Sequence, residues 1–442
     1  MVGVYGANDA ANICYLCLYA LQHRGQEGSG IAVSDCSEIH LHKATGQVSD
    51  IYKKVVLQTL KGNLAIGSNK YSTEKDRHKR NLLPLVAELS FGQFAISLNG
   101  SLLTNKYREE LVKAGTFFTT STDTEVLLHL IARQGTYMKP EEAIAETLKG
   151  IKGAYAALFM TKDKLIAARD PYGFKPLLLG KIEDAYVLAS ETIAFDLIGA
   201  NYIREVEPGE VLVVDKDGLK TYANIGKKER RLCVFEYVYI ARPDSIISGN
   251  SVYKIRKTCG HMLAEQIPAE ADLVVPVPDS GVSAGMGYAQ VSGLPLELGI
   301  IRNHYVGRTF IRPTQEIRNF GVKVKLNPIK DIIRGKRLVV VDDSIVRGTT
   351  CQQIVQMLKE AGAKEVHMRI ASPQIFFPCR YGIDVPSKDD LLANRFSLDG
   401  IRKFIGADSI GFISLDNLIN AVGGSDYCCA CFSGDYPLKE EI

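Results

Sequence analysis

The chain has 442 residues, of which 53 are Lys or Arg, 50 are Asp or Glu, and 46% are hydrophobic. The net charge of +3 is too small to indicate a nucleic-acid partner. No apolar run approaches the roughly 18 residues of a membrane span, and residues 1–10 lack a secretory pattern. We therefore expect a cytoplasmic protein with no membrane segment, and its ten cysteines fit a reducing compartment.

The first half of the chain has the pattern of short strands. Apolar segments predict strands at 1–5, 30–34, 64–66, 93–98, 154–160, 165–168, 186–189 and 211–214. Helical spacing of apolar residues predicts two helices, at 12–23 and 124–133. Successive strands with few helices indicate stacked antiparallel sheets.

The pattern changes after residue 218. A polar, basic stretch at 224–231 is predicted to be a linker. Strands are then predicted at 273–277, 338–341 and 365–370, with helices between them, including one near 350–360. Alternating strands and helices favour a parallel sheet.

Residues 337–350 (RLVVVDDSIVRGTT) carry the strongest chemical signal. Four apolar residues predict a buried strand that ends at Asp342 and Asp343, and Thr349 or Thr350 is expected to cap the next helix. The start of such a helix binds phosphate, and two carboxylates can accept hydrogen bonds from ribose hydroxyls. A simple turn, in which the acids only cap and face solvent, is the alternative.

This segment resembles the phosphoribosylpyrophosphate (PRPP) motif of type I phosphoribosyltransferases. The resemblance implies a second loop for pyrophosphate and Mg²⁺, for which 277–285 (VPDSGVSAG) is the candidate. Ser280 would join the two aspartates as a magnesium ligand, because Mg²⁺ prefers oxygen donors. The expected PRPP-binding residues are Asp342, Asp343, Ser344, Arg347, Gly348, Thr349, Thr350 and Lys323.

Residues 303–327, between the two loops, are rich in basic side chains and poor in acidic ones. Such a loop could close over a polyphosphate, exclude water and neutralise the leaving group. A solvated basic loop is the alternative. With the aspartates, the expected catalytic residues are Tyr305, Arg308 and Lys325.

Longer segments extend the resemblance along nearly the whole chain. CVFEYVYIARPDS (233–245), YVGRTF (305–310) and CCACFSGDYP (428–437) are similar to the glutamine PRPP amidotransferase family, as are HRGQE (23–27) and RDPYGFKP (169–176). The resemblance implies an α+β N-terminal-nucleophile hydrolase-like domain of αββα stacked sheets at 1–225. It implies an α/β type I phosphoribosyltransferase domain with a parallel sheet at 226–442.

The same resemblance implies an activity. The family makes 5-phosphoribosylamine from PRPP and ammonia in purine synthesis, and it normally obtains the ammonia from glutamine. Homodimers or tetramers and inhibition by purine nucleotides are also implied. Mg²⁺ is the expected ion at the phosphoribosyl site.

An iron–sulfur branch of this family ligates a [4Fe–4S] cluster with four cysteines, which correspond here to Cys233, Cys379, Cys428 and Cys431. Zinc is the alternative for four thiolates. Cys429 is expected to be a bystander. Cys14 and Cys17 lie on an apolar helix and are expected to be packed in the core.

The glutaminase half departs from the family pattern. Val2 stands where the family has its nucleophilic cysteine, so no thiol is available there. Lys70 replaces an arginine that would clamp a carboxylate with two parallel bonds. Asn99, Gly100 and Asp123 remain from the amide-binding pocket.

We therefore expect a phosphoribosyltransferase without its own glutaminase, supplied with free ammonia or ammonia from a separate glutaminase. Two alternatives remain open. The chain could transfer the phosphoribosyl group to another amine, or it could be a non-catalytic PRPP- or nucleotide-sensing partner of an active paralogue.

Overall fold

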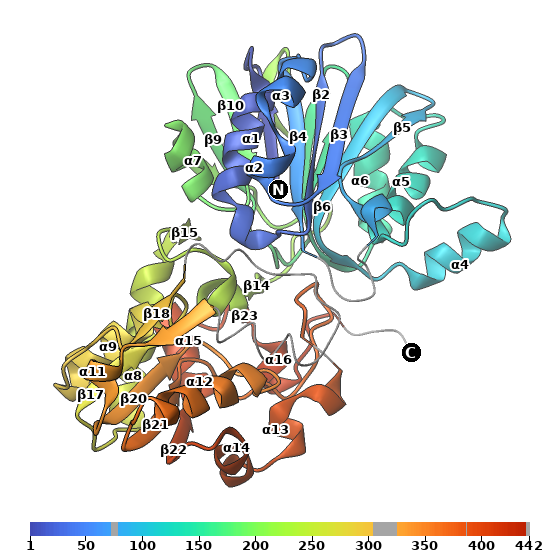
Figure 1. Cartoon of the computed structure of the whole chain (residues 1–442). Helices are drawn as coiled ribbons and strands as arrows, with labels where there is room; N and C mark the ends of the chain where they lie inside the picture. Colours follow the sequence, from blue (N-terminus) through green and yellow to red (C-terminus); the bar gives the residue numbers. More distant parts are fainter. Residues whose placement is uncertain (72–77, 304–324, 386, 439–442) are drawn as a thin grey trace.

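A computed structural model describes residues 1–71, 78–303, 325–385 and 387–438, and Figure 1 shows two lobes. The N-terminal lobe contains two stacked antiparallel sheets, and the C-terminal lobe contains a smaller parallel sheet. Both predicted sheet types are therefore confirmed.

The first sheet of the N-terminal lobe has seven strands in the order β11-β9-β10-β1-β4-β2-β3, and the second has six in the order β13-β12-β8-β7-β6-β5. The strands of the first sheet are β1 (Val2–Tyr5), β2 (Gly28–Ser34), β3 (Ile39–Thr45), β4 (Leu64–Lys70), β9 (Leu178–Ile182), β10 (Ala185–Ala189) and β11 (Asn201–Glu205). Those of the second are β5 (Leu85–Leu89), β6 (Gly92–Leu102), β7 (Gly153–Met160), β8 (Leu165–Arg169), β12 (Glu210–Asp215) and β13 (Gly218–Asn224). Small and branched apolar side chains fill the space between the sheets.

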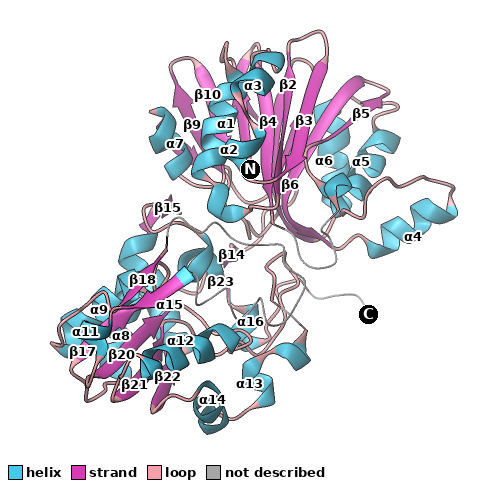
Figure 2. Cartoon of the chain, viewed as in Figure 1, coloured by secondary structure: helices cyan, strands magenta, loops and turns pink. Residues whose placement is uncertain are grey.

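Helices cover the outer faces of both sheets, which completes the predicted αββα layering (Figure 2). The first sheet carries α1 (Ala10–Ala20), α2 (Val48–Ile51), α3 (Lys54–Thr59) and α7 (Ile193–Ile198), and the second carries α5 (Asp123–Gln134) and α6 (Pro140–Gly150). A further helix, α4 (Asn105–Lys113), projects from the lobe. The expectation of two helices was wrong, because the amphipathic helix α6 and several short helices were missed.

The parallel sheet of the C-terminal lobe has the order β17-β20-β21-β22. Its strands are β17 (Leu273–Pro276), β20 (Arg337–Asp342), β21 (Glu365–Ile370) and β22 (Ser409–Phe412). One face packs on α8 (Val252–Gln266), α9 (Val282–Ser292) and α15 (Leu415–Val422), and the other on α12 (Thr349–Glu360) and α14 (Leu398–Ile405). In β20, Val339 and Val341 face the first group while Leu338 and Val340 face the second, which explains its continuous apolar run.

Short elements complete the lobe and join it to the first. They are β14 (Leu232–Cys233), a π-helical turn (Glu236–Ile240), β15 (Ile246–Ile247), β16 (Asn250–Ser251), β18 (Ile300–Arg302), β19 (Leu326–Pro328), α11 (Lys330–Ile333), α13 (Leu392–Arg395), β23 (Tyr427–Cys428) and α16 (Ala430–Ser433), with a 3₁₀ turn at Lys388–Asp390. The N-terminal lobe has 3₁₀ turns at Gln22–Arg24 and Lys79–Asn81. The pair β14–β23 lies close to the N-terminal lobe in Figure 1.

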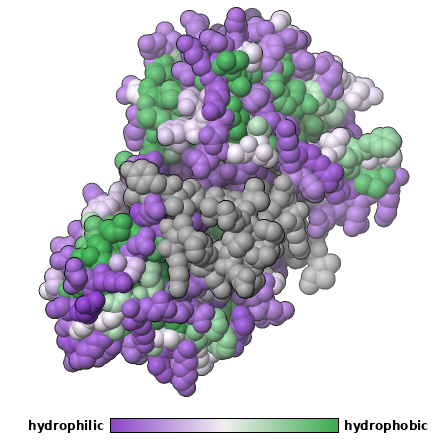
Figure 3. Space-filling model, viewed as in Figure 1, coloured by the Kyte–Doolittle hydropathy of each residue, from purple (hydrophilic) through white to green (hydrophobic). Residues whose placement is uncertain are grey.

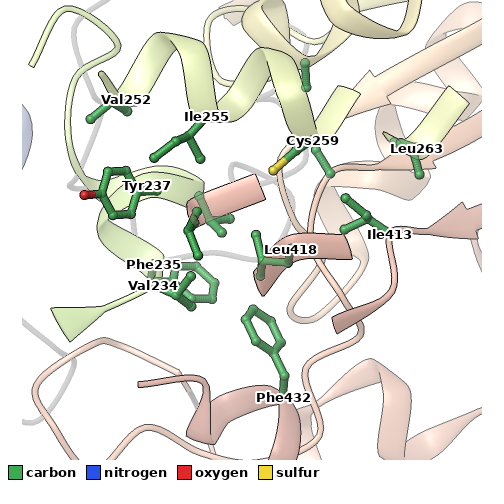
Figure 4. Packing of buried hydrophobic residues seen from close by; sticks show 14 of the residues in the cluster. Val234, Phe235, Tyr237, Val252, Ile255, Cys259, Leu263, Ile413, Leu418 and Phe432 are labelled. Atoms are coloured by element: carbon green, nitrogen blue, oxygen red, sulfur yellow. The ribbon is translucent and has the colours of Figure 1, made fainter. Parts of the chain in front are cut away.

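The segment after β14 is held by an apolar cluster of the C-terminal lobe (Figure 4). Val234 and Tyr237 pack with Val252 and Ile255 of α8, and the ring of Phe235 stacks on that of Phe432 with centroids 5.8 Å apart. This segment is therefore part of the hydrophobic core of the C-terminal lobe.

Hydrophilic residues cover much of the face in Figure 3, and hydrophobic residues gather there in smaller patches. Among the described residues, no helix combines the length and apolar character that crossing a membrane would require.

Candidate active site

An acidic pair stands where β20 ends. Asp342 is its last residue and Asp343 follows, and both side chains are buried, at 8% and 7% exposure. The backbone N–H of Asp343 donates to Oδ1 of Asp342 at 2.9 Å, and the hydroxyl of Ser344 donates to Oδ2 of Asp343 at 2.5 Å. The predicted strand, acids and turn are thus present in the predicted order.

Ser280, which follows the neighbouring strand β17, lies next to the acidic pair. It lies in the turn between β17 and α9, and its hydroxyl donates to Oδ1 of Asp342 at 3.2 Å. Burial raises the pKa of Asp342 well above its usual value, and the adjacent charge of Asp343 raises it further. A cation would relieve this repulsion, so the oxygen donors Ser280, Asp342 and Asp343 suit a hard ion such as Mg²⁺.

The turn into α12 has the shape of an anion site. Gly348 caps the helix with φ +80°, a left-handed conformation that favours glycine, and a Cβ there would lie 2.7 Å from Leu392 Cδ2. The prediction of a threonine cap was wrong, because α12 begins at Thr349 and no side chain caps it. Arg347, Thr349 and Thr350 are exposed around the N–H groups that begin the helix.

A short ribbon supports both ends of the basic segment. β18 pairs antiparallel with β19, and the N–H of Asn303 donates to the carbonyl of Lys325 at 2.8 Å. Arg302 of this ribbon forms an ion pair with Asp279, next to Ser280. Of the residues predicted here, Lys325 is half-buried, whereas Tyr305, Arg308 and Lys323 lie outside the described residues.

Arg256 was missed by sequence reasoning. It lies on α8, is 7% exposed, and lines a small cavity together with Tyr237, Ser280 and Asp343. Its guanidinium donates to the carbonyls of Tyr237 at 2.6 Å and Ala241 at 2.8 Å. The sequence did contain a signal for this residue, because a charged side chain among the apolar positions of a helix is unusual and points to a specific role.

The cysteines predicted to bind metal gather at the junction between the lobes. Cys233 and Cys428 are register partners in the β14–β23 pair, and the N–H of Tyr381 donates to Sγ of Cys379 at 3.3 Å. Burial, and then the nearby Cys233, Cys379 and Cys428, raise the pKa of Cys431 well above its usual value. In the described part of the chain, no group of three or more His, Cys, Asp or Glu has the arrangement for a metal ion. The predicted iron–sulfur site therefore stays a prediction.

Position 2 offers no nucleophile. The Val2 side chain is fully buried in the cluster that packs α1 on the first sheet. Opposite it in β4 is Gly67, where a Cβ would lie only 2.6 Å from Sγ of Cys14. Burial raises the pKa of Cys17 to about 12 and that of Cys14 well above its usual value, which suits their predicted role in the core.

The remaining pocket residues lie on other elements. Asn99 and Gly100 are in β6 of the second sheet, and Nδ2 of Asn99 is buried without a partner among the described residues. Asp123, the first residue of α5, accepts hydrogen bonds from the N–H of Leu102 at 3.0 Å and from neighbouring hydroxyls. Lys70 ends β4, where its backbone passes the turn before β2. The two sheets therefore carry different parts of the predicted pocket.

Comparison with known proteins matches both lobes. A glutamine amidotransferase domain model matches residues 72–196, and a phosphoribosyl transferase domain model matches 248–371. Amidophosphoribosyltransferase 1 of Arabidopsis thaliana is 50% identical over 99% of this chain and 78% of its own length. The Bacillus subtilis amidophosphoribosyltransferase is 45% identical over 99% of this chain and 93% of its own length. The chain belongs to the amidophosphoribosyltransferase family.

Solved structures agree with this assignment to the amidophosphoribosyltransferases. One described as the allosteric regulatory enzyme of purine biosynthesis has a TM-score of 0.94 and 45% identity, covering 99% of this chain and 95% of that one. The B. subtilis amidotransferase complexed with ADP and GMP has a TM-score of 0.93 and 45% identity, covering 99% and 96%. The expected fold, a glutaminase-like domain joined to a type I phosphoribosyltransferase domain, is confirmed, and the chain is a transferase of purine biosynthesis that forms phosphoribosylamine from PRPP.

Proposed function

We propose that this amidophosphoribosyltransferase uses ammonia directly and does not hydrolyse glutamine itself. The observation that carries this proposal is the contrast between its two sites. The phosphoribosyl site has the acidic pair Asp342–Asp343, and Ser280 is hydrogen-bonded to Asp342, which supports the proposed PRPP site. At the other site, Val2 has neither a nucleophilic atom nor exposed surface. The glutamine amidotransferase match begins at residue 72 and does not reach this position.

The reaction follows from the groups at the phosphoribosyl site. The N–H groups at the start of α12 bind the 5-phosphate, and Asp342 and Asp343 accept hydrogen bonds from the ribose hydroxyls. The bond from C1 of the ribose to pyrophosphate breaks while the ammonia nitrogen bonds to C1, and nitrogen then loses a proton. Mg²⁺ held by Ser280 and the aspartates would neutralise charge on pyrophosphate. The roles of Arg347, Lys323, Lys325, Tyr305 and Arg308 toward PRPP belong to the same proposal.

We infer that Cys233, Cys379, Cys428 and Cys431 hold a [4Fe–4S] cluster. Four thiols from three chain segments meet at the lobe junction, and the N–H bond to Cys379 is of a kind that tunes cluster sulfurs. A four-iron cluster is larger than a single metal ion. The four cysteine sulfurs that bind it therefore need not be close enough to one another to bind one shared ion. The cluster would fasten the C-terminal segment to the lobe junction. Zinc remains the alternative.

The remaining assignments rest on relatives and on sequence pattern. We propose a boundary between domains 1–225 and 226–442, since β13 ends at Asn224 and the two matched ranges fall on either side. The solved structure of a relative is a complex with ADP and GMP, which supports purine nucleotides as inhibitors here. The homodimeric or tetrameric state and the cytoplasmic location stay predictions.

Pyrophosphate release from PRPP, Mg²⁺ and ammonium tests the transferase half. The wild-type chain should release pyrophosphate, and Asp343→Asn should slow it by at least about tenfold, since a lost bond to a charged group costs about 1.5–3 kcal/mol. PRPP binding without turnover would instead favour a sensing subunit. Turnover only with a different amine would favour the other alternative.

A further inference from the structure

Arg24 of the N-terminal lobe is almost completely buried at the lobe junction. Its guanidinium makes a two-pronged bond to Glu236 of the C-terminal lobe, with Nη1–Oε2 at 2.9 Å and Nη2–Oε1 at 2.8 Å. The same Nη1 lies 2.7 Å from Oε1 of Glu191. The Arg24 side chain is 9% exposed and both carboxylates are fully buried.

Glu191, which contacts Arg24, also contacts residues of both lobes. Its Oε1 also contacts Nε2 of His23 at 2.6 Å, and its Oε2 accepts the N–H of Arg242 at 3.0 Å and the hydroxyl of Ser245 at 2.6 Å. Burial alone would raise the pKa of Glu191, but the bond from His23 and the charge of Arg24 hold it well below its usual value. Glu191 is therefore ionised and saturated with donors.

The connection continues into the phosphoribosyl site. Glu236 opens the π-helical turn Glu236–Ile240, a rare conformation that is frequent at functional sites. The carbonyls of Tyr237 in this turn and of Ala241, which directly follows it, accept both hydrogen bonds from Arg256. Arg256 in turn lines the cavity that also touches Asp343 and Ser280.

These contacts form a continuous chain from the N-terminal lobe to the acidic pair. Arg24 fixes Glu236, Glu236 fixes the turn, and the turn fixes Arg256 beside the acidic pair. The side chains of Arg24, Glu236 and Arg256 are each nine-tenths buried or more, so a lost bond would leave a buried polar group without a partner, which is costly. A forked arginine–carboxylate pair also fixes orientation, which a lysine cannot do.

We propose that Arg24 and Glu236 are positioning residues for PRPP binding, so that the glutaminase-like lobe serves here as a scaffold for the phosphoribosyl site. This role rests on the proposed PRPP chemistry but not on the loss of glutaminase. The N-terminal lobe would then have a structural role in PRPP binding, although Val2 offers no nucleophile.

The test compares two matched pairs in the full chain. R24M/E236Q removes the junction pair, and R204M/E210Q removes a forked pair within the N-terminal lobe, with bonds of 2.7 and 2.8 Å. Both should lower the melting temperature. The KM for PRPP, measured with ammonium, should rise about tenfold in R24M/E236Q and stay unchanged in R204M/E210Q, since site-to-site coupling is commonly about 5–150-fold. Saturating PRPP should restore most of kcat.

Two further measurements keep the test decisive if the double variant does not fold. R24K keeps the charge without the fork and should give an intermediate KM. In the wild-type chain, PRPP with Mg²⁺ should slow hydrogen exchange across residues 236–241. A wild-type KM in folded R24K or R24M/E236Q, or no change in exchange when PRPP binds, would overturn the proposal. A wild-type chain that binds no PRPP would instead refute the proposed function.

Discussion

The ring of Tyr381 stacks on the ring of Phe174, with centroids 4.5 Å apart and planes 27° apart. Tyr381 follows Cys379 in the C-terminal lobe, and Phe174 belongs to the N-terminal lobe, as does Gly100 of the predicted amide pocket. The next residue, Gly382, has φ +85°, and a Cβ there would lie 2.9 Å from the carbonyl carbon of Gly100. The segment that follows Cys379 is thus in contact with Gly100 of the predicted amide pocket.

Gly382→Ala should destabilise the chain for two reasons. Its positive φ costs an alanine about 1–2 kcal/mol, and the clash with Gly100 adds about 1–3 kcal/mol. Gly406→Ala is the matched control, because Gly406 has φ +76° and a Cβ there would meet nothing within 4 Å. Urea unfolding should show a larger loss for Gly382→Ala. Equal losses of unfolding free energy in the two variants would mean that the clash with Gly100 contributes nothing to the destabilisation.

Binding of PRPP with Mg²⁺ should release protons. Burial and Asp343 raise the pKa of Asp342, so it holds a proton in the free protein to a higher pH than an ordinary aspartate. Because the ion requires the carboxylate, affinity should rise with pH until the pH exceeds this raised pKa. Without ligand, stability should fall over the same range, since the folded state binds more protons than the unfolded state.

Titration calorimetry in two buffers of different ionisation enthalpy measures this release. The heats should differ between buffers for the wild-type chain. The difference should shrink in Asp342→Asn, which has no proton to lose. Buffer-independent heats for the wild-type chain would show that Asp342 is already ionised before the ion binds.

The cysteine variants should divide into two groups. Cys428→Ser and Cys431→Ser should lose iron and visible absorbance, because each removes a proposed ligand, whereas Cys429→Ser should keep both. Iron, zinc and sulfide analysis of protein prepared without oxygen measures the content. Iron retained in Cys431→Ser, or zinc in place of iron, would show that the cluster assignment is wrong.

Val2→Cys should not restore glutamine hydrolysis. The new thiol would be buried in the cluster beneath α1, where Val2 has no exposed surface. Lys70 would still lack the forked bond of an arginine to the substrate carboxylate. Glutamate formation from glutamine measures the outcome, with the unchanged chain as control. A large gain from this one change would show that the rest of the pocket is intact.

The sequence predicted the phosphoribosyl lobe better than the junction. The apolar run of β20 and the acids at its end follow from local chemistry, so the strand was placed correctly, while the role of the acids toward PRPP stays a prediction. By contrast, Arg24, Glu236 and Arg256 lie far apart in the chain and meet only through tertiary packing. The helix α6 was missed because its apolar positions are spaced among charged residues, and the cap of α12 was misassigned because Gly348 adopts a left-handed conformation.

The central claim is tested most directly by initial rates of phosphoribosylamine formation from PRPP and Mg²⁺, with glutamine, with ammonium, and with neither. We expect product with ammonium, and with glutamine no more than in the blank. Product with glutamine at a rate near that with ammonium, from chain free of any other glutaminase, would contradict the account.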